Sequence, residues 1–369
     1  MLVIIGVAVC GEYHHHRSVA VALNRPGETL LLNTVLLNTA ASRKTRYTIA
    51  ALGVLLLASA CGASTTAPGS GSTSNATSAG SSAAGSSAAA SEDVPSPLNL
   101  NLTKDDAIAA GLPDKYKQSG AIVVATDASY PPNEFVVEGS NDPIGMDIDL
   151  ANALGQILGL KVTIEPASFA GIIAGINAGR YDMSLSSFTD TKAREESVNF
   201  VTYFEAGTST MVVAGNPKNI KTITDLCGLP VGAENGTTQL DQLNDATVDG
   251  SVVKACTDAG KPAPIAQGFP TQIDVNSALV AGRIDAYLAD SPVVAYAVKQ
   301  TGDKFEKVGE DQDAAPYGIA LPKDPAALTT TMQQAMQKLI DSGAYMKILD
   351  NWGVSSGAIT TSAVNGAIY

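Results

Sequence analysis

The feature that most constrains this chain is an alternation, from about residue 95 onward, of short apolar runs with segments of helical apolar spacing. Such alternation is typical of α/β proteins, in which helices cover a mostly parallel sheet. Ala121–Thr126 is predicted to be a buried strand, and residues 145–158 repeat their apolar side chains at helical spacing. Further strands are predicted at 161–165, 182–186, 231–233 and 285–289, and further helices at 169–178, 273–281, 326–342, 344–352, after Thr237 and after Ser291.

A low-complexity segment precedes this region. Residues 62–91 are almost entirely Ser, Ala, Gly and Thr, which cannot bury enough apolar surface to offset the entropy of ordering. We therefore expect residues 62–94 to be a disordered linker. About 30 flexible residues span roughly 30 Å root-mean-square, which suits a tether.

The segment 1–61 has the features of a secretory signal. Arg43, Lys44 and Arg46 precede an apolar run at 47–57, and small residues lead from there to Cys61. The run is shorter than the roughly 20 residues that a membrane-spanning helix needs. The cysteine makes the segment resemble a bacterial lipoprotein signal, although Ala58 stands where that family favours Leu. The resemblance implies lipidation of Cys61 and an extracytoplasmic protein anchored to the cell membrane. The alternatives are an ordinary cleaved signal or an embedded apolar segment.

The first 42 residues do not fit such a signal, because they contain a second apolar run near 30–37. We expect the true start to lie near residue 35–43. The stretch upstream of it would then be a mis-called start.

Charge and histidine content exclude several classes of function. The chain has a net charge of −13, and residues 1–61 hold five basic and two acidic residues, so the remainder carries 18 basic, 34 acidic and a net charge of −16. This acidity argues against nucleic-acid binding and favours cationic small partners. All histidines lie at 14–16, within the signal segment. Removal of that segment therefore excludes His-based catalytic triads and His-ligated metals.

Five segments carry a resemblance to a known family. The stretch from Val124 to Pro132 resembles the first strand and loop of family 3 solute-binding proteins, which are receptors of ABC importers for polar amino acids. Segments 144–150, 169–173, 186–200 and 282–292 agree with the same family in order and spacing. The resemblance covers roughly residues 118–352.

The resemblance implies the two-lobed periplasmic-binding-protein type II fold, an α/β architecture with a ligand cleft between lobes and two hinge crossovers. We place the crossovers at 211–214 and 317–321. Lobe 1 is expected to comprise 95–212 plus 316–369, and lobe 2 to comprise 213–315. The family also implies a monomer without a cofactor that delivers an amino acid to an ABC permease in the membrane.

Arg194 stands where the family binds the ligand carboxylate. A guanidinium fork fits a carboxylate with two parallel hydrogen bonds, which Lys cannot do. A surface arginine on a short helix is the alternative, and Thr191 is interpreted as the N-cap of that helix. Thr237 and Thr238 begin another helix and match the family's second contact to the ligand carboxylate. The alternative is that they only cap that helix.

Asp290 matches the position that binds the ligand ammonium, and Ser187 and Thr189 match its other contacts. The alternative for Asp290 is to be the N-cap of the helix that begins at Ser291. Tyr130 and Phe169 match the aromatic residues that sandwich the ligand side chain. Ordinary packing is the alternative for both aromatic residues.

The ligand side chain is the hardest feature to predict. Asp127 matches an acidic position that binders of cationic amino acids use, and Glu134 and Glu234 are expected near the cleft. The pair Ser186 and Ser187 resembles lysine/arginine/ornithine binders. Together these residues favour a cationic or polar ligand, with a turn-initiating role as the alternative for Asp127. Asn133 departs from the family, which usually has an aromatic residue there.

Cys227 and Cys256 are predicted to form a disulfide in lobe 2, because two free thiols are unusual outside the cytoplasm. Two buried free thiols are the alternative. Their spacing excludes a CxxC redox pair, and the lack of further ligands excludes a four-ligand zinc site.

An enzyme is the main alternative function, because some dehydratases and peptidoglycan-cleaving proteins carry this fold. An enzyme needs a general acid or base beside the reacting bond. The chain after its signal has no histidine, and the cleft carboxylates already have binding roles. We therefore expect a non-enzymatic receptor. A sensor lobe that reports ligand occupancy to a signalling partner is a third possibility.

Overall fold

The computed structural model describes residues 94–369. The predicted signal, the lipidation cysteine Cys61 and the tether up to residue 93 lie outside the described residues. Within 94–369, no helix combines the length and the apolar character needed to cross a membrane.

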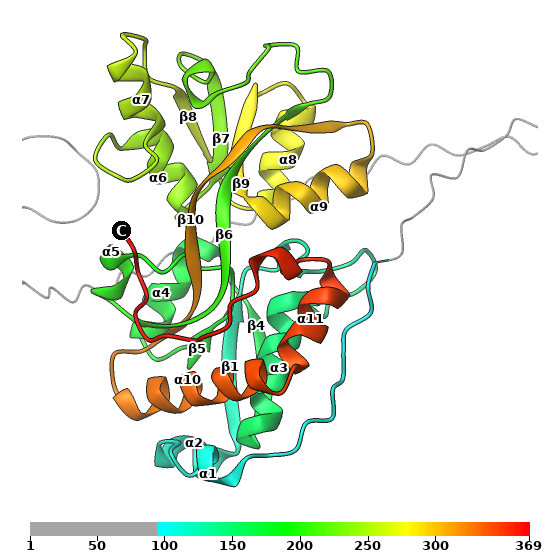
Figure 1. The fold of residues 1–369 in the computed structure, drawn as a ribbon, viewed down its shortest axis with the longest axis vertical. Helices are drawn as coiled ribbons and strands as arrows, with labels where there is room; N and C mark the ends of the chain where they lie inside the picture. Colours follow the sequence, from blue (N-terminus) through cyan, green and yellow to red (C-terminus); the bar gives the residue numbers. More distant parts are fainter. Residues whose placement is uncertain (1–93) are drawn as a thin grey trace, which may run out of the picture. The chain divides into compact units, whose positions relative to one another are not determined.

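An eight-stranded mixed sheet, ordered β4-β1-β5-β10-β6-β9-β7-β8, forms the framework (Figure 1). Parallel pairs join β4, β1 and β5 at one end and β9, β7 and β8 at the other, and antiparallel β6 and β10 connect them. A small hairpin pairs β2 with β3. The strands are β1 (Ala121–Thr126), β2 (Ser129–Tyr130), β3 (Glu134–Phe135), β4 (Lys161–Pro166), β5 (Met183–Ser184), β6 (Asn199–Val213), β7 (Pro230–Glu234), β8 (Ile265–Phe269), β9 (Ala286–Asp290) and β10 (Phe305–Leu321).

The β1 half of the sheet carries most of its apolar core where α3, α10 and α11 pack on it. Leu150, Leu154, Tyr203 and Tyr345 have no exposed surface in this cluster, and Trp352 is also buried. A smaller cluster forms around α4. The helices of this half are α1 (Asp106–Ala109), α2 (Asp114–Ser119), α3 (Met146–Leu158), α4 (Phe169–Asn177), α5 (Lys192–Glu195), α10 (Ala326–Asp341), α11 (Ala344–Trp352) and the 3-10 turn η2 (Ser355–Gly357).

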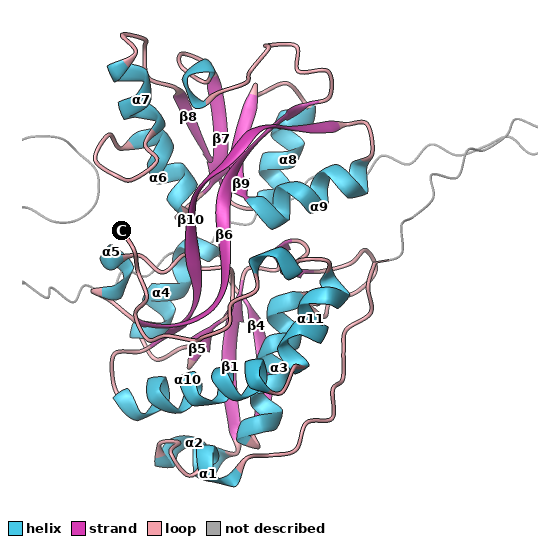
Figure 2. Cartoon of the chain, in the orientation of Figure 1, coloured by secondary structure: helices cyan, strands magenta, loops and turns pink. Residues whose placement is uncertain are grey.

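The β7 half has two apolar clusters of its own, one around Leu226, Val231 and Cys256 and one around Val275 and Tyr287. Helices lie on both sides of the strands here as well (Figure 2). Separate cores on the two halves explain how each half holds together independently of the other. The helices are α6 (Thr238–Asn244), α7 (Val252–Asp258), α8 (Gln272–Val280), α9 (Ser291–Thr301) and the 3-10 turn η1 (Ile223–Asp225).

The long strands β6 and β10 pass from one half to the other. Their pairing shifts register three times between Val308 and Gly318. Thr208–Met211 of β6 already pair with β9, so the predicted crossover at 211–214 lies too far along the chain. The passage lies nearer 205–207, opposite residues 315–316 of β10. Irregular pairing at this point weakens the ladder where bending is required.

Most predicted elements are present with small shifts at their ends. Ala121–Thr126 is a strand as predicted, and α3 begins at Met146 within the predicted helix 145–158. The predicted strand 182–186 is only Met183–Ser184. Beyond it, Ser187 has a positive φ of 52°, so extended backbone cannot continue through that residue.

The predicted disulfide is present. Cys227 and Cys256 are joined, 29 positions apart, and tie the chain after η1 to α7. Cys256 is fully buried in the apolar cluster of this half.

Replacing both cysteines with alanine should lower the free energy of unfolding by roughly 3–4 kcal/mol, because the cross-link limits the unfolded chain. Chemical denaturation of the double variant checks this. Wild-type protein treated with a reductant is the matched control and should lose a similar amount. Equal stability of the double variant and the oxidised wild type would contradict a stabilising role for this bond.

Candidate functional site

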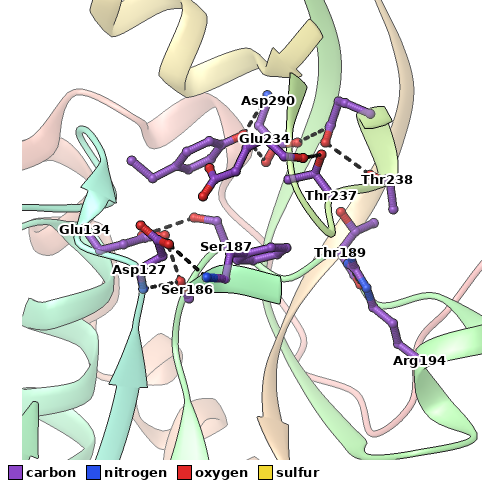
Figure 3. A pocket seen from close by; sticks show the side chains of 13 residues that line it. Asp127, Glu134, Ser186, Ser187, Thr189, Arg194, Glu234, Thr237, Thr238 and Asp290 are labelled. Atoms are coloured by element: carbon purple, nitrogen blue, oxygen red, sulfur yellow. Dashed lines mark hydrogen bonds between the residues drawn. The ribbon is translucent and has the colours of Figure 1, made fainter. Parts of the chain in front are cut away.

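A cavity of about 290 Å³ lies where β1–β3, α4 and α5 of one half meet β7, α6 and β9 of the other (Figure 3). Every residue predicted to contact a ligand lines it. Glu134 and Glu234 line it as well, and Gln239 is a lining residue that the sequence did not single out. The lining consists of Asp127, Tyr130, Glu134, Phe169, Ser186, Ser187, Thr189, Arg194, Glu234, Thr237, Thr238, Gln239 and Asp290.

Arg194 reaches the cavity from the one-turn helix α5. Its guanidinium donates to the carbonyl oxygens of Thr189 (2.8 Å) and Gly236 (2.9 Å). It also lies over the rings of Phe169 and Phe188, at 5.6 and 5.2 Å from their centroids. Among residues 94–369, no carboxylate forms an ion pair with it. The remaining N–H groups are therefore available to an anionic partner.

The Asp290 carboxylate faces the cavity rather than the helix that follows it. Asp290 occupies the N-cap position of α9, but its side chain makes no capping hydrogen bond. It accepts from the Tyr130 hydroxyl (2.9 Å) and from Gln239 Nε2 (2.8 Å). Burial raises the pKa of Asp290 to about 6, so the group is mostly ionised at neutral pH. A buried carboxylate held in this way is suited to pair with an ammonium group.

Three further carboxyl groups gather at the end of the cavity away from Arg194. Glu134 accepts from the hydroxyls of Ser186 (3.3 Å) and Ser187 (3.2 Å). Burial, with the nearby Asp147, raises its pKa well above the ordinary range. Burial also raises the pKa of Glu234 to about 9, and its Oε1 has no hydrogen-bond partner within the described chain.

Asp127 combines two roles that the sequence left open. Its Oδ2 accepts from the backbone N–H of Phe169 (2.8 Å), so it orders the turn into α4. It also lines the cavity beside Glu134 and Glu234. The three groups leave this end of the cavity acidic.

The aromatic residues serve both packing and lining. Phe169 stacks on Phe188 with ring centroids 4.2 Å apart, and it lines the cavity. Tyr130 bridges the two halves, because its hydroxyl also accepts from the backbone N–H of Asp290 (3.0 Å).

Thr237 and Thr238 differ in how many hydrogen bonds their hydroxyl groups already make. The Thr237 hydroxyl donates to the Glu234 carbonyl (2.7 Å) and accepts from Leu240 N–H (3.2 Å), so it caps α6. Thr238 has a single weaker side-chain contact, 3.3 Å to Gln239 Oε1. Of this pair, Thr238 has the freer hydroxyl. Thr191 caps α5 as predicted.

A buried network behind the cavity was missed from the sequence. Asp147 accepts from Ser187 N–H (2.9 Å) and from the Tyr203 hydroxyl (2.7 Å). Asn133 donates to Ser187 Oγ (2.9 Å). The only sequence signal was Asn133 in place of an aromatic residue. Asp147 lies within the matching segment 144–150, but Tyr203 is 56 positions away, and no spacing in the sequence connects the two residues.

Comparisons with known proteins identify relatives of this chain. Residues 122–355 match the family described as bacterial extracellular solute-binding proteins, family 3. The arginine-binding protein ArgT of Corynebacterium glutamicum is 30% identical over 70% of this chain and 82% of its own length. A solved ancestral arginine-binding protein bound to arginine is 34% identical, covers 63% of this chain and 98% of that one, and gives a TM-score of 0.56. A solved ancestral amino acid-binding protein, described as a precursor of cyclohexadienyl dehydratase, is 29% identical. It covers 65% of this chain and 98% of its own chain, and it gives a TM-score of 0.56.

The buried Glu234 predicts a pH dependence of stability. Its folded pKa of about 9 exceeds the ordinary value of 4.5, so the folded state retains a proton that the unfolded state loses. Stability should therefore fall as pH rises from 4.5 to 9, with a slope from this group approaching about 1.4 kcal/mol per pH unit. Glu234→Gln should flatten the slope in ligand-free protein, as measured by urea unfolding at pH 6 and 8. Exposed Glu138→Gln is the control, and equal slopes in all three proteins would contradict the assignment.

Proposed function

Because the chain belongs to the bacterial extracellular solute-binding proteins of family 3, we propose that it is the receptor of an ABC importer and binds a cationic amino acid, with arginine the best fit. The observation that carries this proposal is the charge layout of the cavity. Among residues 94–369, one end presents a guanidinium that forms no ion pair with a carboxylate, and the other presents carboxyl groups that form none with Lys or Arg. A zwitterion with a second positive charge at its far end complements both.

The ligand would lie along the cavity in one direction. Its carboxylate would pair with Arg194, with Thr238 as a second contact. Its ammonium would pair with Asp290, assisted by Ser187 and Thr189.

The ligand side chain would then run between the two aromatic walls, Tyr130 and Phe169. Its distal charge would reach Asp127, Glu134 and Ser186. In Figure 3 these groups lie on the side of the cavity opposite Arg194. Glu234 approaches the same region from the other half, so both halves would contact one ligand.

Binding would be coupled to closure about β6 and β10. We place the lobe boundary at the passage near 205–207 rather than at the predicted residue 212, so that lobe 1 comprises about 95–206 plus 316–369 and lobe 2 about 207–315. Hydrogen bonds from Tyr130 to Asp290 and from Arg194 to the Gly236 carbonyl already join them. A ligand touching both sides adds contacts only in the closed form, which is what drives hinge closure.

We also propose that the protein acts as a monomer held at the outer face of the cell membrane by a lipid on Cys61. Residues 62–94 would then tether the binding lobes to that anchor. Such a tether leaves the cavity free to meet the permease at the membrane surface.

A dehydratase-like activity is the second candidate. It draws support from the relative described as a dehydratase precursor and from cavity carboxyls with raised pKa, which can serve as general acids. We favour binding alone, because Glu134 and Glu234 lie where a ligand cation is expected. Mass spectrometry of amino acids incubated with the protein separates the two, since a receptor returns them unchanged.

Thermal unfolding of residues 92–369 against a panel of amino acids, ornithine, citrulline and polyamines tests the ligand class. Arginine at 100 times its Kd should add about 2.7 kcal/mol of stability. Arg194→Ala should abolish the shift, because the ligand carboxylate loses its guanidinium. Arg194→Lys, which keeps the charge without the fork, should restore only part of it. A panel in which no amino acid shifts the transition would overturn the proposal.

Glu134→Gln tests the distal cation site. Arginine binding should weaken by about tenfold to a hundredfold, because a charge-assisted hydrogen bond of roughly 1.5–3 kcal/mol is lost. Citrulline, a neutral molecule of nearly the same shape, should be affected far less. Isothermal titration of the wild type and the variant with both ligands gives the change in Kd for each ligand. Equal losses for both ligands would place the distal cation elsewhere.

A further inference from the structure

The segment 363–369 forms a strap along β6. Ala363 and Thr202 exchange two hydrogen bonds, from Thr202 N–H (2.9 Å) and to its hydroxyl (2.8 Å). Asn365 and Phe200 exchange two more, of 3.0 and 2.8 Å. The family match ends at residue 355, so the strap lies outside the matched residues.

Beyond Asn365 the strap turns onto the segment that carries Arg194. Gly366 N–H donates to the Asp190 carboxylate (2.7 Å), and Ala367 N–H donates to the Glu195 carboxylate (3.1 Å). Lys192 N–H donates to the Tyr369 carbonyl (3.0 Å). These three partners, Asp190, Lys192 and Glu195, lie on both sides of Arg194 in the sequence.

Helix α5 depends on such outside contacts. It contains only Lys192–Glu195, a single turn, and an isolated turn of helix is unstable in water. Its own side-chain support is the Thr191 cap. The strap therefore supplies one hydrogen bond to the backbone of α5, at Lys192, and two to the Asp190 and Glu195 side chains on either side of Arg194.

The strap also reaches the cleft itself. In Figure 1 the chain ends between α5 of one lobe and α6 of the other. The Tyr369 phenol lies near the charges of Arg194, Asp290 and Asp313, and burial raises its pKa to about 12. Asp190 is fully buried, and its second oxygen has no partner within the described chain.

We propose that residues 366–369 are a positioning element that holds Arg194 in place for the ligand carboxylate. This inference rests on the proposed function of Arg194. It assigns the strap a role in affinity for ligands that carry an α-carboxylate. A strap that only stabilises lobe 1 would affect every ligand alike.

The test uses arginine and agmatine, which has the same guanidinium and amine but no carboxylate. In the full chain, deletion of residues 366–369 should weaken arginine about tenfold in isothermal titration and change agmatine by less than twofold. An unchanged arginine Kd, or equal losses for both ligands, would overturn the proposal.

A substitution series covers the case in which the deletion does not fold. Asp190→Ala removes the acceptor of the Gly366 N–H, whereas Asp190→Asn retains an acceptor oxygen and removes the same charge. Arginine binding should be weak in the alanine variant and largely restored in the asparagine variant. Equal arginine affinity in the two variants would count against a positioning role.

Arg194→Ala distinguishes the proposed role of Arg194 from the proposed role of the strap. It should weaken arginine strongly and leave agmatine nearly unchanged. A result in which it affects neither ligand, or both equally, would overturn the proposed role of Arg194. If Arg194→Ala behaves as expected while the strap variants bind normally, only the positioning role is overturned.

Discussion

The site depends on an imbalance of charge: four carboxyl groups, Asp127, Glu134, Glu234 and Asp290, surround a cavity that contains one guanidinium. Burying that many carboxyls without counter-charges is costly, so some of them hold protons at neutral pH. A cationic ligand removes this cost by supplying the missing positive charge. Part of its binding energy is thus relief of a strain that the folded protein already carries. A neutral amino acid of the same size would leave the cost in place, which is how unsatisfied groups discriminate between ligands.

Such an arrangement needs a rigid wall, and lobe 1 provides it through the network behind the cavity. Asp147 fixes the backbone N–H of Ser187, whose positive φ of 52° points its hydroxyl toward Glu134. Asn133 holds the same hydroxyl from the other side. An aromatic residue at 133 could not make this contact, so the departure from the family has a structural reason. Strain of this kind persists only where neighbouring groups over-determine the conformation.

The α/β alternation and the short motifs predicted the architecture and the residues that line the cavity, because each depends on local pattern. Three things were beyond local pattern. The position of the crossover depends on which strand β6 pairs with. The sequence of an apolar run such as 211–214 does not show which strand that is. The carboxyl network depends on Asp147 and Tyr203 meeting across the fold. Gln239 reached the cavity only because the turn at Thr237 sets the direction of α6.

The two ends of the cavity are held in different ways, and this difference bears on how the protein evolves specificity. The acidic end is built into the sheet and its core, so its geometry is costly to change. Arg194 instead extends from one turn of helix braced by a peripheral strap. Every amino acid presents the same carboxylate, so the Arg194 end needs accuracy rather than variety. A brace outside the residues that match the family supplies that accuracy without disturbing the residues at the acidic end, which are free to determine which side chain is accepted.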